Sequence, residues 1–218
     1  PSVFVTYKDF SQSGAQISPE SGHGGNVRYT SYLPMNNTMT TYNKYDLSYV
    51  RYFSGILPKH HALMWKAQWS QIDRNITSAN FLFSQAQATQ PNSIYPTYLM
   101  RGYSSGTFQG RTFLQSSLEY RLPVTQIYSG TGTNPIYFKR IHGAFIVDGI
   151  SLDGFAYEAN SRFYRRVSQE RNFWSTGIEV KLDTTIGYHF PMTLYTGIYY
   201  PIDQSLTSGA NFALGLFL

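Results

Sequence analysis

Residues 173–183 read FWSTGIEVKLD, and from Gly177 onward apolar side chains alternate one for one with polar residues or glycine. Val180 and Leu182 fall on one side of an extended chain, whereas Glu179 and Lys181 fall on the other. Successive side chains of a β-strand point to opposite faces, so a period of two is typical of a strand whose faces meet different surroundings. The stretch therefore predicts a two-faced β-strand.

The same alternation recurs along the whole chain, and no segment shows the period of an amphipathic helix. Eight further strands are predicted at residues 3–10, 26–33, 44–53, 62–71, 111–122, 137–149, 190–200 and 210–218. Most of these strands have about the length that a tilted membrane-crossing strand needs. The pattern predicts an all-β chain of about nine strands.

The composition indicates what surrounds the two faces. Charged residues make up 13% of the chain and aromatic residues 17%, with 19 Tyr and 15 Phe, whereas soluble domains carry about 25% charge. The polar faces consist of Ser, Thr, Gln and Gly with isolated charges of both signs. These features favour a transmembrane antiparallel β-barrel with a polar lumen over a soluble β-sandwich or lipocalin-like barrel. In such a barrel we expect the outward, lipid-facing residues to include Leu114, Leu118, Ile178, Val180, Leu182, Leu194 and Leu216, and the inward residues to include Gln115, Glu119, Asp148, Glu179 and Lys181. No apolar run is long enough for a membrane-spanning helix.

Several other classes of protein are disfavoured. The net charge is +5, but the basic residues are scattered, so we expect no nucleic-acid binding. The chain has no Cys, its five His lack ligand spacing, and no nucleophile motif is found, so we expect no metal, no cofactor and no enzymatic activity. The first residues lack the pattern of a signal peptide, so we expect a processed protein or a piece of a longer one.

Five short motifs, in order, carry a resemblance to a known family. They are SPESG (18–22), MRGY (100–103), LEYRLP (118–123), FIVDG (145–149) and FALGLFL (212–218). With them the chain resembles, over most of its length, the C-terminal barrel region of the BamA/TamA-type outer-membrane assembly-factor superfamily, also called the bacterial surface antigen family.

The resemblance implies one outer-membrane barrel domain over residues 1–218, with a long extracellular loop at 73–110 that folds into the lumen. In the family the Arg-Gly-aromatic motif tips this loop, here Arg101, Gly102 and Tyr103, and its arginine meets acids on the two following strands. By position these acids are Glu119 and Asp148. The alternation independently places both acids on the inward face. We therefore expect these five residues to form a structural loop lock.

The resemblance also implies a topology. Residues 151–170 and 202–209 become extracellular loops, and residues 57–60 and 184–187 become periplasmic turns. The last strand supplies one side of a seam with the first strand of the barrel, through Phe212, Gly215, Leu216 and Leu218. Because single-chain bacterial barrels have even strand numbers, nine strands indicate either the C-terminal eight to nine strands of a sixteen-stranded barrel or a small eight-stranded barrel.

The function implied by the resemblance is to insert or translocate other outer-membrane proteins from a location in the bacterial outer membrane. The expected partners are outer-membrane lipid, unfolded outer-membrane polypeptides and periplasmic accessory proteins. Two alternatives stay open at this point. The chain could be a passive pore or structural barrel, or it could be the membrane anchor of a separate domain.

Overall fold

The structure is a computed structural model of the 218-residue chain. It describes all residues except 13–15, 33–41, 54–56, 74–99, 104–107, 131, 134, 159–164, 188, 205–208 and 218, and for residues 108–111, 154–158, 165–171 and 217 it describes the backbone alone. The predicted loop at 73–110 thus lies largely outside the described residues, as does Leu218.

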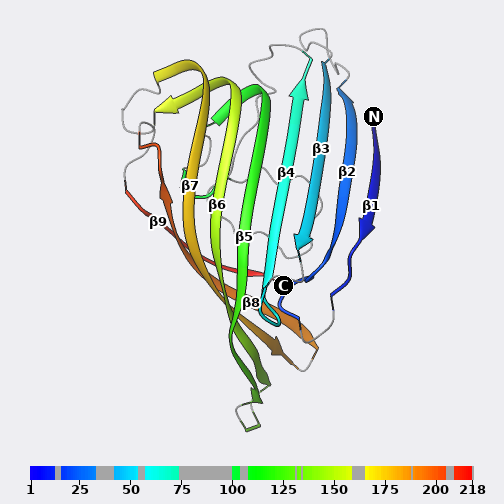
Figure 1. The fold of residues 1–218 in the computed structure, drawn as a ribbon, viewed down its shortest axis with the longest axis vertical. Helices are drawn as coiled ribbons and strands as arrows, with labels where there is room; N and C mark the ends of the chain where they lie inside the picture. The colour runs from blue at the N-terminus through cyan, green and yellow to red at the C-terminus, as the bar shows by residue number, and fades with distance from the viewer. Residues whose placement is uncertain are drawn as a thin grey trace.

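The described residues form one antiparallel sheet of nine strands, each paired with its neighbours in the sequence (Figure 1). The strands are β1 (Ser2–Asp9), β2 (Gly22–Tyr32), β3 (Tyr42–Phe53), β4 (Ala62–Ile72), β5 (Phe108–Gly130), β6 (Ile136–Glu158), β7 (Arg165–Ile186), β8 (Phe190–Pro201) and β9 (Asn211–Phe217). The prediction of an all-β antiparallel chain is confirmed, and each predicted strand has a counterpart.

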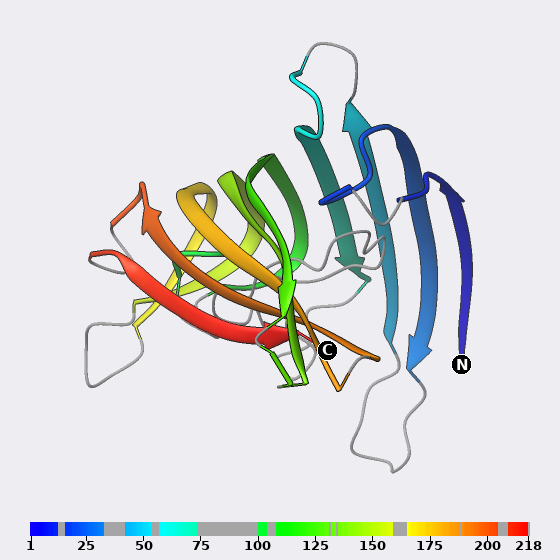
Figure 2. The ribbon, with the colours of Figure 1, turned by 90° about the horizontal axis from the view of Figure 1, so that it is seen from below.

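The sheet is strongly curved but is not closed. Seen from below, its strands follow an arc with β1 and β9 at the two ends (Figure 2). Among the described residues, β1 pairs only with β2, and β9 pairs only with β8. A closed barrel is therefore not observed, and the sheet has two free edges.

The two faces divide the side chains as the alternation predicts. The residues predicted to point outward are exposed on the convex face, except for the half-buried Leu182; the exposed ones are Leu114, Leu118, Ile178, Val180, Leu194 and Leu216. The residues predicted to point inward are buried on the concave face, and they are Gln115, Glu119, Asp148, Glu179 and Lys181. The convex face thus exposes many large apolar side chains, and the concave face buries charged ones, which soluble proteins rarely bury.

Three strands, β5, β6 and β7, are much longer than predicted. β6 continues to Glu158 and β7 starts at Arg165, so the loop predicted at 151–170 is wrong for most of its length. The two strands pair across this region, for example Asp153 with Glu170, because each satisfies the backbone of the other. β5 continues to Gly130, and register shifts after Pro123 conceal its alternation. The resulting β5–β6 hairpin projects below the other strands (Figure 1).

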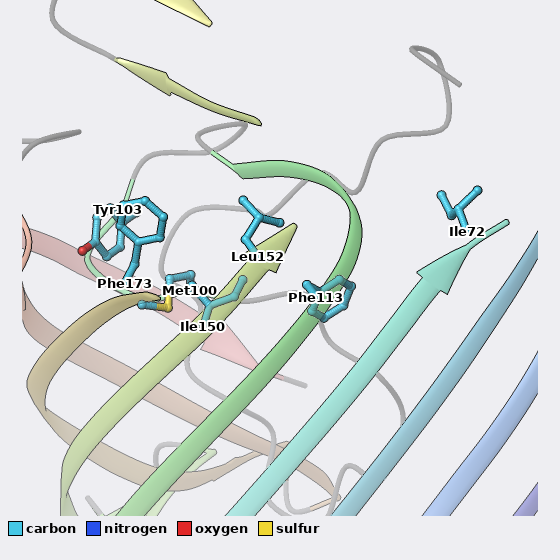
Figure 3. Close-up of a cluster of buried hydrophobic side chains, with 7 residues drawn as sticks. All are labelled: Ile72, Met100, Tyr103, Phe113, Ile150, Leu152 and Phe173. Atoms are coloured by element: carbon cyan, nitrogen blue, oxygen red, sulfur yellow. The ribbon is translucent and has the colours of Figure 1, made fainter. Parts of the chain in front are cut away.

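An apolar cluster fills the upper part of the concave face. Two of its members, Met100 and Tyr103, come from the connection between β4 and β5, and the others come from β4, β5, β6 and β7 (Figure 3). The strand members are Ile72, Phe113, Ile150, Leu152 and Phe173. This cluster packs the described tip of the long predicted loop, residues 100–103, against the sheet.

Candidate functional site

The candidate site is a buried charged network around Arg101. The guanidinium of Arg101 holds Asp148 with two hydrogen bonds, from Nε to Oδ2 at 2.6 Å and from Nη2 to Oδ1 at 2.7 Å. Its Nη1 donates to Glu119 Oε1 at 2.9 Å and to Glu179 Oε1 at 3.3 Å. Nη2 also donates to Ser117 Oγ at 2.8 Å. All five N–H donors of the guanidinium are thereby used.

The structure thus brings together Arg101, Glu119 and Asp148, the three charged residues of the expected loop lock. Arg101 is only 1% exposed. Burial alone would lower its pKa, but the negative charges of Asp148 and Glu119 outweigh that effect and hold the pKa well above its usual value. Arg101 therefore stays charged, and the bidentate pair with Asp148 fixes the plane of its guanidinium.

The carboxylates differ in how far they depend on Arg101. Glu119 Oε2 also accepts hydrogen bonds from Arg121, at 2.7 and 3.0 Å. Glu179 lies 2.8 Å from Lys181 Nζ and accepts a hydrogen bond from the Tyr199 hydroxyl at 2.5 Å. The described hydrogen bonds of the Asp148 carboxylate, in contrast, both come from Arg101.

Glu179, Ser117 and Tyr199 are partners that the sequence reasoning missed. The alternation put Glu179 on the inward face but gave no sign that the loop tip reaches as far as β7. The resemblance assigned acids only on the two strands that follow the loop, which are β5 and β6. The missed signal was the shared parity of Glu179, Glu119 and Asp148 on three adjacent strands.

Gly102 has a backbone conformation and a site that suit glycine. Its φ of +89° lies in the left-handed region, which side chains other than hydrogen rarely adopt. A Cβ there would lie 3.2 Å from the Cβ of Ser175 and 3.4 Å from the backbone N of Pro201. The loop tip therefore approaches β7 and β8 as closely as glycine allows.

Tyr103 anchors the other end of the tip. Its hydroxyl lies 3.1 Å from the carbonyl oxygens of both Trp174 and Asp203 and can donate its one hydrogen to either of them. Its ring meets Phe173 edge to face, with centroids 6.1 Å apart. Burial and the negative charge of Asp203 raise the pKa of Tyr103, so the hydroxyl stays protonated.

The tip also reaches the last strand. The side-chain amide of Asn211, the first residue of β9, donates to the carbonyl oxygen of Gly102. With this bond, residues 100–103 contact every strand from β5 to β9. Of the residues expected at the seam, Phe212 and Leu216 lie on the convex face and Gly215 lies half-buried on the concave face, covered by the ring of Tyr195.

The charged network holds the loop tip in one conformation against the strands. The three carboxylates of the network, Glu119, Asp148 and Glu179, each lie within 3.3 Å of a cation, so each acid is held as the charged partner of a cation. In the part of the chain that the structure describes, no group of three His, Asp or Glu side chains could hold a metal ion. Such buried and mutually paired charges fix the position of the loop tip relative to the strands.

Comparisons with models of protein families, with curated proteins and with solved structures find no match for this chain. Within the described residues, no segment forms a helix with the length and apolar character needed to cross a membrane.

Proposed function

We propose that the nine strands are a wall of a transmembrane β-barrel in the bacterial outer membrane. The observation that supports this is the exposure of large apolar side chains on the convex face of the sheet together with the burial of charged side chains on the concave face. Large apolar side chains are exposed over the convex face, with Leu214 at 74% and Ile178 at 53%, whereas Glu119 and Glu179 on the concave face are fully buried. An apolar surface of this extent is a liability in water, and lipid would cover it.

The tryptophans make a direct test possible. All three lie on strands with convex-face parity, and they are Trp65, Trp69 and Trp174. In vesicles that contain brominated phosphatidylcholine, we expect strong quenching of their fluorescence and little quenching by aqueous iodide. The opposite pattern, with iodide quenching and no effect of brominated lipid, would show that the convex face lies in water and would refute the proposal.

We further propose, from the family resemblance, that this barrel assists the insertion or translocation of other outer-membrane polypeptides. The two free edges support an activity of this kind, because the unpaired backbone groups of β1 and β9 can template another strand. Outer-membrane lipid and unfolded polypeptides are the partners that this role requires, with periplasmic accessory proteins as further candidates.

The insertion role is tested with vesicles that carry the protein. An unfolded outer-membrane barrel polypeptide is added, and its folding is followed by heat-modifiable gel mobility. We expect folding to be faster than in empty vesicles and in vesicles that carry an unrelated barrel of similar size. Release of a small trapped solute without faster folding would instead support the passive pore.

A further inference from the structure

The connection between β1 and β2 does not stay at the edge of the sheet. The carbonyl oxygen of Gln16 accepts a hydrogen bond from Nη1 of Arg140, at 2.8 Å. Arg140 belongs to β6 and has the same parity as Asp148, so it lies on the concave face. Because β3, β4 and β5 separate β2 from β6 in the sheet, this contact crosses the concave space and does not follow the backbone ladder.

The same connection is buried to a degree that is unusual for a turn. Ile17 is 5% exposed and Ser18 is fully buried, whereas connecting segments normally run over the surface in contact with water. A short connection becomes buried when it packs against the interior of the fold. We name residues 16–20 the inner strap.

Arg140 is held in position by the strands beneath it. Its Nε donates to Asp183 Oδ2 at 2.6 Å, and the other oxygen of Asp183 accepts a hydrogen bond from Thr193 at 2.8 Å. His142 Nε2 lies 3.4 Å from that same oxygen. The guanidinium therefore has a defined orientation, in which Nη1 points away from the sheet toward the carbonyl oxygen of Gln16.

The strands near the other edge of the sheet also hold the connection between β1 and β2. The ring of Phe10, which follows β1, packs against Tyr52 of β3 with centroids 5.1 Å apart. Glu20 lies 3.3 Å from Nδ1 of His60 in the turn between β3 and β4. The connection is thus fastened to β3 and the β3–β4 turn on one side and to β6 on the other.

We propose that residues 16–20 form an inner strap that closes the lower end of the concave face and that Arg140 is the residue that positions it. A polypeptide that moves along the concave face from this end has to displace the strap from Arg140 first. This blocking role rests on the proposed barrel and insertion function, whereas the strap itself does not.

The absence of cysteine makes the strap testable by thiol chemistry. A Ser18→Cys variant carries a single thiol at a fully buried site, and Ser2→Cys provides an exposed reference on β1. In the folded protein in detergent, we expect Cys at position 18 to react with a maleimide about tenfold or more slowly than Cys at position 2. Adding Arg140→Ala should abolish most of this difference by accelerating the reaction at position 18 alone.

Matched variants separate release of the strap from general loosening. Arg51→Ala removes an arginine from the exposed convex face of β3 and should leave the reaction at position 18 unchanged. Arg140→Lys keeps the charge but cannot serve both Asp183 and Gln16 in the planar geometry of the guanidinium, so an intermediate rate is expected. Should Arg140→Ala prevent folding, Arg140→Lys and Asp183→Asn provide the same comparison in folded protein.

Two results would overturn the strap, namely equal reactivity at positions 18 and 2 in the parent protein, or no acceleration in any folded Arg140 or Asp183 variant. The blocking role is measured separately in the vesicle folding assay, where Arg140→Ala should speed insertion about twofold or more. An accelerated thiol reaction with an unchanged insertion rate would overturn the blocking role. Failure of the parent protein to speed insertion would refute the proposed function while leaving the thiol result intact.

Discussion

Replacement of Arg101 by alanine is the sharpest perturbation of the charged network. It removes all five donors from a site that is 1% exposed. Glu119 keeps Arg121, and Glu179 keeps Lys181, whereas Asp148 loses both of its described hydrogen bonds. Breaking a buried ion pair by removing one partner typically costs about 3–5 kcal/mol, because the remaining charge is left uncompensated. We expect a loss of this size in the free energy of unfolding.

Two double-mutant cycles measure how much of this loss in the free energy of unfolding comes from the pair of Arg101 and Asp148. Combining Arg101→Ala with Asp148→Asn removes the stranded charge, so we expect a coupling free energy of about 1–3 kcal/mol. Combining Arg101→Ala with Glu119→Gln should give less than half of that value, since Glu119 has its own arginine. Urea unfolding of the protein in detergent micelles, followed by tryptophan fluorescence, provides the free energies.

The conservative and remote variants serve as controls. Arg101→Lys should recover only part of the stability, because an ammonium group cannot hold a carboxylate with two parallel hydrogen bonds. Arg51→Ala, on the exposed face of β3, should change stability by less than about 0.5 kcal/mol. Additive effects of Arg101→Ala and Asp148→Asn, within about 0.5 kcal/mol, would mean that the two residues do not interact and would refute the reasoning.

Three further changes test other parts of the fold. Gly102→Ala should destabilise the fold by about 1–3 kcal/mol through backbone strain and crowding, and so lower the thermal unfolding temperature. The matched control is Gly132→Ala, because Gly132 also has a positive φ but has open space around it, and it should lower that temperature less. Equal effects of the two variants would contradict the close approach of the tip. Gly215→Ala should speed hydrogen exchange of the β9 amides, because its Cβ would collide with the ring of Tyr195; unchanged exchange would argue against that packing. Leu118→Arg should cost about 2–4 kcal/mol in lipid vesicles if the residue lies near the midplane, and little if the convex face lies in water.

The strands and their faces were predictable from the sequence because alternation is a local property. Val180 and Glu179 are assigned to opposite faces by parity alone, and both assignments agree with the observed burial. Whether the sheet closes was not predictable in this way. The period of two assigns each side chain to a face but does not determine how many strands complete a circuit, so an open arc and a closed barrel share the same pattern.

The hairpin extensions were missed for a different reason. Beyond Leu152, β6 is still paired with β5 on one side and with β7 on the other, but with Asp153 and Gly154 the contrast between apolar and polar residues weakens in the sequence. A strand can persist there because the ladder of backbone hydrogen bonds does not need a buried face. The contact of Arg101 with Glu179 was missed because it depends on how deeply the tip enters the curved sheet, which is a property of tertiary packing.

Among the described residues no pairing between β1 and β9 fixes the curvature of the sheet, so contacts across the concave face add to the intrinsic twist of the strands in setting it. The tip of residues 100–103 joins β5 to β9, and the Arg140 contact joins the β1–β2 connection to β6. Burying so many charges contributes little net stability, because desolvation offsets most of their attraction. Their directional bonds, however, allow only one position of the tip relative to five strands. Apolar side chains of equal volume would allow the tip many positions, because their contacts are not directional. The charged interior is therefore best explained by the need to hold the tip in a single position.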